Sequence, residues 1–255
     1  MDISFTHFLL GLLLLIVPVG VIRIFEIPLM SRLMSAVARM AVFTAVAAAL
    51  MYVALRYDNV WLNILIAIIF VMISALMVLW RARLNVRIYI LPISLGLLSA
   101  VVFIGICVLL LTAGGAQMAN ARFLIPVAAI LSASSVVACA DALSVYYAGL
   151  RHHNQLYYYL LGNGATHTEA LYYLMRRALQ RSLLPGMARM SALVVMASPV
   201  VMWMMVMAGT DVFTAAALQI LLMVAVSSTS TLSVLVALYM AGRYVTDDYG
   251  RLKNK

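Results

Sequence analysis

Two long runs without a single charged residue limit what this chain can fold into. They cover residues 60–80 and 89–112. A helix needs about 20 residues to cross a hydrocarbon core roughly 30 Å thick, and both runs are that long. Inside lipid each backbone polar group must be satisfied within the segment, which a helix achieves by itself. The sequence therefore predicts an α-helical membrane protein.

The rest of the chain continues this pattern. Hydrophobic residues make up 66% of the sequence and charged residues only 10%, too few charges to cover the surface of a soluble protein. The opening residues Met1–Ser4 carry no basic group, so we interpret the first apolar run as a membrane span and not as a cleavable signal. We expect an all-α, polytopic membrane protein with one transmembrane domain over 1–255. The predicted spans are 5–22, 36–55, 60–80, 89–112, 122–149, 189–208 and 213–242.

Basic residues alternate sharply between the segments that join these spans. All but two of the 17 basic residues fall in segments on one side, and the exceptions are Arg56 and Arg122. Because loops rich in arginine and lysine stay in the cytoplasm, we expect the N-terminus outside and the C-terminus in the cytoplasm. This asymmetry accounts for the net charge of +9, so the charge gives no reason to expect a nucleic-acid partner.

One cytoplasmic segment, 150–188, is predicted to be much longer than the others. Thr166 and Glu169 have the spacing of a capping box, in which each side chain satisfies a free N–H at a helix start. We expect a helix from His167 to Leu184, ended by Pro185-Gly186. Its apolar and basic residues fall on different faces, which fits two roles. The helix lies on the membrane with its arginines against anionic headgroups, or it docks a cytoplasmic partner.

Several polar residues lie inside the predicted spans. Asp141 is the only acidic residue well inside one, and a charge there needs a partner or a watery cavity. It is either a cation or proton site or a group bonded to a Ser or Thr of another span. Gln219 and the hydroxyls of 227–231 line a route through the last span, or they serve helix packing. We expect no metal site, because Cys107 and Cys139 lie in separate apolar runs.

The C-terminal half of the chain resembles a known family. Leu161, Gly164-Ala165-Thr166 and Leu183-Leu184-Pro185 match a pattern of the FetB-type ABC transporter permeases, and Arg176 falls where that family carries an arginine. The resemblance continues through the positions that follow: Pro199, Ala208-Gly209-Thr210-Asp211, Ala215, Gln219-Ile220 and the Ser/Thr cluster 227–231. In the N-terminal half, Arg39 and Pro126 are the positions that match.

This resemblance implies the permease subunit of an ABC transporter linked to iron or other metal export. In such permeases a short cytoplasmic helix fits a groove of an ATPase subunit, and here its residues would be Gly164, Ala165, Thr166, Glu169 and Arg176. The chain has no Gly-x-x-x-x-Gly-Lys-Ser/Thr loop, so ATP would bind to a separate ATPase subunit. The simplest assembly is a homodimer of permeases with two ATPases in a bacterial inner membrane.

A substrate pathway is expected to pass Asp141, Pro199 and Gln219. Several positions depart from the family. Val200 and Met204 replace glycines, Ala133-Ser134 replaces Gly-Asn, Leu218 replaces a tyrosine and Val212 replaces a proline. The alternatives are an ATP-independent carrier or channel and a non-transporting membrane scaffold. An enzyme is not expected, since the chain shows no Ser-His-Asp, HExxH or paired-carboxylate arrangement.

Overall fold

The computed structural model consists of helices joined by short turns over the part of the chain that it describes, which is 13–57, 59–112, 114–152, 154–192 and 199–245. The chain falls into two compact units, Met1–Arg56 and Tyr57–Lys255. In the first unit, η1 (Leu13–Leu15) and α2 (Ile16–Ile24) are followed by α3 (Met30–Tyr57). The turn after α2 places Glu26 at a φ of 51°, a left-handed conformation that ends the helix.

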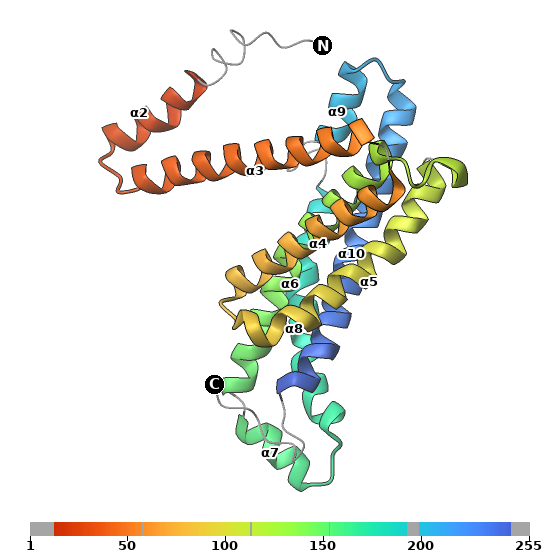
Figure 1. Cartoon of the computed structure of the whole chain (residues 1–255). Coiled ribbons are helices and arrows are strands. Elements are labelled where there is room, and N and C mark those ends of the chain that lie inside the picture. Colours follow the sequence, from red (N-terminus) through yellow and green to blue (C-terminus); the bar gives the residue numbers. More distant parts are fainter. Residues whose placement is uncertain (1–12, 58, 113, 153, 193–198, 246–255) are drawn as a thin grey trace. The chain divides into compact units, whose positions relative to one another are not determined.

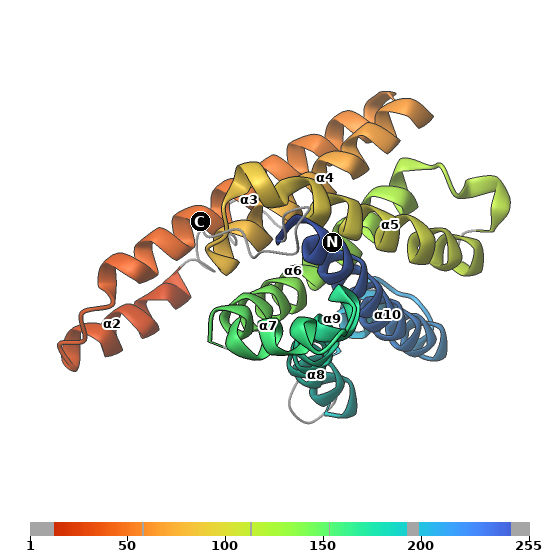
Figure 2. The ribbon, with the colours of Figure 1, turned by 90° about the horizontal axis from the view of Figure 1, so that it is seen from below.

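The second unit is a bundle of helices (Figures 1 and 2). Its elements are α4 (Val60–Ala82), α5 (Val86–Thr112), η2 (Gly115–Gln117), α6 (Ala121–His152), α7 (Asn154–Gly162), α8 (His167–Ser191), α9 (Val200–Met207) and α10 (Val212–Val245). Helix α10 packs most extensively on α5, and α4 packs on α6. Helix α6 also contacts α10 and α8, so it lies at the centre of the unit.

Small residues allow α5 and α10 to approach closely. A Cβ atom added at Gly96 of α5 would lie 3.0 Å from the backbone nitrogen of Ala237 on α10. Fully buried apolar residues surround this crossing, including Ile93, Leu97 and Leu238. Glycine and alanine at such crossings let helix backbones pack in lipid, where no hydrophobic force drives helices together.

Five of the seven predicted spans coincide with long apolar helices. These helices are Met30–Tyr57, Val60–Ala82, Tyr89–Thr112, Ala121–His152 and Val212–Gly242. Many large apolar side chains on them are exposed, such as Trp61, Phe103 and Phe213, as expected for surfaces that face lipid. The predicted fold class, an all-α polytopic membrane protein, is confirmed.

The other two predicted spans lie partly outside the described residues. Of 5–22, the structure describes a short apolar helical stretch from Leu13, which continues to Ile24. Of 189–208, it describes the end of α8 and the short helix α9. Both remain predictions as continuous spans.

One expectation about α8 is wrong. Pro185-Gly186 does not end the helix, which continues to Ser191 with Pro185 in its interior. Proline removes one helical hydrogen bond but can be accommodated where neighbouring helices pack on the segment. Ser182, Leu183 and Gly186 line a cavity together with residues of α6 and α10. The last part of the predicted cytoplasmic segment 150–188 therefore packs beside α6 and α10.

One end of the second unit carries a group of arginines, and we call it the basic end. It comprises Arg81 and Arg83 at the end of α4, Arg151 at the end of α6, and Arg176, Arg177 and Arg181 of α8. Arg122, at the start of α6, lies at the opposite end of that helix.

Candidate functional site

The turn between α7 and α8 is formed by the residues that carry the family resemblance. The N–H of Ala165 donates to the carbonyl of Leu160, and the N–H of Gly164 donates to the carbonyl of Leu161. This pair of bonds is the Schellman motif, which needs a left-handed residue just after the helix. Gly164 supplies it with a φ of 86°. Helix α7 therefore ends in a Schellman motif formed by Leu161 and Gly164-Ala165.

The next residues begin α8 with the predicted capping box, which is confirmed. The backbone N–H of Glu169 donates to the Thr166 hydroxyl, and the backbone N–H of Thr166 donates to Oε2 of Glu169 at 2.8 Å. The Thr166 hydroxyl also lies 2.8 Å from Oε2. The bond from the Thr166 backbone, followed by that from its hydroxyl, lowers the pKa of the Glu169 carboxyl below its ordinary value.

We predict that acid loosens the start of α8. Because the folded-state pKa of Glu169 is lowered, its stabilising effect is present above the unfolded-state pKa and is lost as the pH falls through the folded-state value. Amide hydrogen exchange at Thr166 and Glu169 should accelerate over this acidic range. Glu169→Gln retains an acceptor for the box, so its exchange should lack the pH step. A step of equal size in this variant would contradict the assignment.

Helix α8 buries one face and exposes the other. Its buried residues are Ala170, Leu171, Leu174, Ala178 and Ser182, which recur at helical spacing. They pack toward α6 and α10: a Cβ atom at Gly149 of α6 would clash with Leu174, and one at Gly242 of α10 would lie 3.9 Å from Leu171. The apolar face is therefore covered by protein, so α8 is not a separate helix lying on the membrane.

Helices α7 and α8 form a hairpin, and its exposed face is aromatic and basic. Tyr158 and Tyr159 of α7 are exposed, as are Tyr172 and Tyr173 of α8, and Arg176 lies one turn further along. Gly164, Thr166 and Glu169 are exposed and Ala165 is partly buried. All five residues predicted to couple to an ATPase thus lie on one projecting hairpin.

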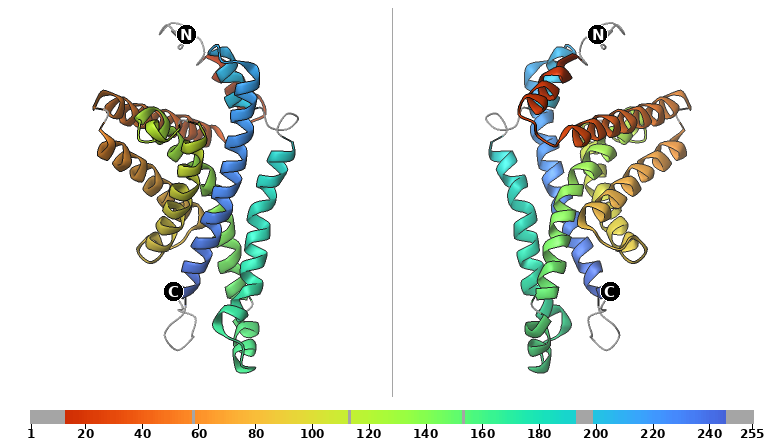
Figure 3. Two further views of the ribbon diagram at one scale, coloured as in Figure 1. Left: turned by 90° about the vertical axis from the view of Figure 1, so that its right-hand side faces the viewer. Right: turned by 90° about the vertical axis from the view of Figure 1, so that its left-hand side faces the viewer.

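The hairpin projects past the ends of α4 and α5. Nε of Arg81, in the last turn of α4, lies 3.9 Å from Oδ1 of Asp141, so Asp141 is level with that end. Helix α6 continues from Asp141 to His152, roughly 16 Å at 1.5 Å per residue. Helix α7 and the first half of α8 extend this projection (Figure 3).

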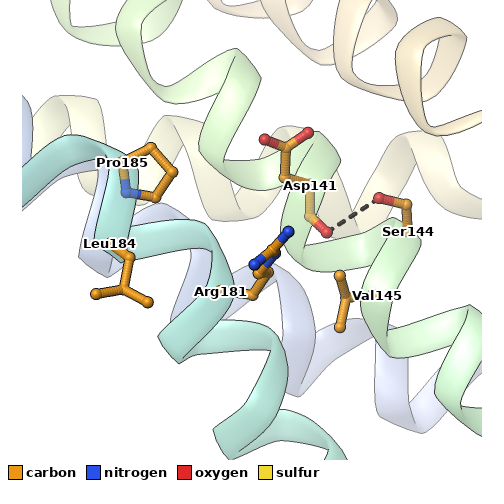
Figure 4. Close-up of a pocket in the computed structure, with 6 residues that line it drawn as sticks. All are labelled: Asp141, Ser144, Val145, Arg181, Leu184 and Pro185. Atoms are coloured by element: carbon orange, nitrogen blue, oxygen red, sulfur yellow. Dashed lines mark hydrogen bonds between the residues drawn. The ribbon is translucent and has the colours of Figure 1, made fainter. Parts of the chain in front are cut away.

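Asp141 therefore sits at the basic end of the bundle, and its partner is an arginine rather than a Ser or Thr. The side chains of Arg81 and Asp141 are 56% and 43% exposed. Asp141 also lines an open cleft of about 500 Å³ with Arg181 and Pro185 of α8 (Figure 4). The arginine partner and the open cleft are both settings in which a charged group is tolerated in such a helix.

We predict that Asp141→Asn has little effect on stability. An exposed ion pair contributes less than about 1 kcal/mol, so the free energy of unfolding in detergent should fall by no more than that. Urea or detergent titration of the purified variant measures it. A loss several times larger would mean that the carboxylate belongs to a buried network instead.

A second cavity, partly open to the outside, lies between α6, α8 and α10. Its volume is about 100 Å³, and four serines line it: Ser134, Ser182, Ser227 and Ser230. The hydroxyls of Ser134, Ser182 and Ser230 donate to carbonyls of their own helices, so they present oxygen lone pairs to the cavity. The lining also includes Arg189, Met190 and Met223.

The structure gives Gln219 and Pro199 roles at a helix hairpin. Pro199 precedes α9 and is buried, and Oε1 of Gln219 accepts a hydrogen bond from the backbone N–H of Met202. Gln219 of α10 thereby satisfies a free N–H in the first turn of α9. Gly209, with a φ of 94°, ends α9, and Asp211 accepts bonds from the N–H groups of Phe213 and Thr214. The residues that match Ala-Gly-x-Asp therefore end α9 and begin α10.

The family model described as an uncharacterised protein family, UPF0014, matches residues 5–245. The chain belongs to this family. The match includes both predicted spans that the structure describes only in part. Comparison with curated proteins and with solved structures gave no match.

Sequence reasoning missed several residues of this UPF0014 chain. It did not single out Ser134 or Ser182 as cavity residues, nor Asn63, which is fully buried in α4 and donates to the carbonyl of Ala119. Asn63 had a signal, since an amide in an uncharged span needs a partner. No sequence signal pointed to Ser134 or Ser182, because their shared cavity depends on which helices pack together.

Proposed function

We propose that this UPF0014 chain is the membrane-spanning permease subunit of an ABC transporter, driven by a separate ATPase subunit. The observation that carries the proposal is the projecting α7–α8 hairpin. It places the exposed residues of the family pattern beyond the lipid-facing bundle, where a soluble subunit can reach them. The absence of a phosphate-binding loop in the sequence means that ATP hydrolysis has to come from that partner.

The packing of α8 gives the hairpin a mechanical role. The tip of the hairpin carries Gly164 and Thr166, while Ser182 and Gly186, further along α8, line the cavity between α6, α8 and α10. A rigid helix that contacts a partner at one end and a cavity at the other transmits movement between them. ATP-driven motion at the tip would therefore reach α6 and α10 through α8.

The serine-lined cavity is the best candidate for part of the substrate route. It lies along α6 and α10 between Asp141 and Gln219, since Ala138 is about one turn before Asp141 and Met223 one turn after Gln219. Hydroxyl and thioether groups there are neutral ligands. The FetB-type resemblance supplies iron or another metal as the proposed cargo, moved outward by a homodimer of this chain.

The test is to purify the tagged full-length chain gently from its native membrane and identify co-purifying proteins. We expect an ATPase subunit, with two copies of each chain in the intact complex. Arg176→Glu should release the ATPase, because it reverses the charge on the exposed face of the hairpin. Arg122→Glu makes the same change at the opposite end of the bundle and should not release it. A stable chain that purifies alone and transports without ATP would establish a secondary carrier instead.

A further inference from the structure

A groove between α6 and α8 opens to the outside of the bundle at the basic end. It has a volume of about 510 Å³ and is lined by Val145 of α6 and by Arg177, Gln180, Arg181 and Leu184 of α8. It adjoins the Asp141 cleft, with which it shares Val145, Arg181 and Leu184. The two hollows form one continuous groove along the α6–α8 contact.

The charge of this groove is mostly positive. Asp141 is the one acidic residue among the described residues of its lining, and it is paired with Arg81 of α4. Among the described residues, neither Arg177 nor Arg181 has an ion-pair partner, and both are exposed. Figure 4 shows Arg181 reaching from α8 across the groove toward the turn of α6 that holds Asp141. Two guanidinium groups are therefore available to an anion.

The position of the groove favours an anion that belongs to the membrane. Because Asp141 is level with the end of α4, the groove lies where the lipid-facing span gives way to polar surroundings. Phosphate groups of a bilayer lie at this boundary. Leu184 and Met187 continue along α8 away from the tip and are exposed, as apolar chains running into the bilayer require.

We propose that the α6–α8 groove binds the headgroup of an anionic phospholipid through Arg177 and Arg181. Arginine is suited to this role because its planar guanidinium binds phosphate oxygens in pairs. Gln180 adds a side-chain amide donor between the two arginines. The acyl chains lie along Leu184, so the lipid would join α8 to α6 just where α8 emerges from the bilayer. The proposal does not depend on an ATPase partner.

Native mass spectrometry of the full-length chain, released from detergent with added lipid, tests the proposal. We expect dioleoylphosphatidylglycerol to be retained about tenfold more strongly than dioleoylphosphatidylcholine. Arg177→Gln/Arg181→Gln should remove that preference. Arg151→Gln/Arg176→Gln removes the same charge at the same end but outside the groove lining, and it should keep the preference.

A further variant is expected to strengthen the retention of phosphatidylglycerol. Asp141→Asn removes the carboxylate from the groove and frees Arg81, so retention of phosphatidylglycerol should increase several-fold. A misfolded protein would not show such a gain. Equal losses in the two double variants, or equal retention of both lipids by the unaltered chain, would overturn the proposal. Displacement of the lipid by inorganic phosphate at equal concentration would identify a site for free phosphate and overturn the lipid assignment.

Discussion

Gly96→Ala is expected to destabilise the bundle, although it adds a single methyl group. The added Cβ atom would lie 3.0 Å from the nitrogen and 3.2 Å from the Cα of Ala237. These are backbone atoms of α10, so no side-chain rotation relieves the contact and the helices have to separate. Overpacking of this kind costs about 1–3 kcal/mol. Unfolding of the purified chain by detergent titration should show a loss in that range.

Gly105→Ala provides the matched control on the same helix. The nearest atom to its Cβ would be a methyl of Leu131 at 3.9 Å, an ordinary contact. We expect its free energy of unfolding to stay within about 0.5 kcal/mol of the unaltered chain. Gly96→Leu should be worse than Gly96→Ala, because α5 and α10 share the most extensive contact of the unit. If Gly96→Ala and Gly105→Ala unfold alike, the close crossing of α5 and α10 is wrong.

The long helices could be predicted from the sequence because their signal is local. An uncharged run such as 60–80 needs no knowledge of its neighbours to be assigned as a span. The capping box at Thr166 is local too, since its two side chains satisfy each other's backbone. The end of α8 was not predictable in this way. Pro185 ends a helix in most settings, but here α6 and α10 pack beside the residues that follow it.

In the candidate site, too, the features formed by adjacent residues could be predicted, whereas those formed by helix packing could not. The turn residues Gly164 and Thr166 could be found from the sequence, because a turn is formed by adjacent residues. The cavity and the groove could not, because they join residues from α6, α8 and α10 that are far apart in the chain. The pairing of Asp141 with Arg81 was also out of reach, since it depends on where α4 ends beside α6.

Gly164→Val is expected to disable the hairpin without crowding any neighbour. Gly164 has a φ of 86°, and no atom lies within 4 Å of the position that its Cβ would take. The effect of a side chain is therefore purely conformational. A β-branched residue in the left-handed region costs about 1–2 kcal/mol, which opposes the Schellman turn between α7 and α8. Because that turn sets the start of α8, the capping box should loosen with it.

Gly164→Asn separates this effect from the mere loss of glycine, because asparagine tolerates the left-handed conformation. Amide hydrogen exchange at Ala165 and Glu169 should accelerate about tenfold in Gly164→Val and remain nearly unchanged in Gly164→Asn. If the hairpin docks an ATPase, only the valine variant should lose most of the co-purified subunit. Faster exchange with full retention of the ATPase would leave the turn correctly assigned but show that the partner binds elsewhere. Normal exchange in the valine variant would show that the turn itself is wrong.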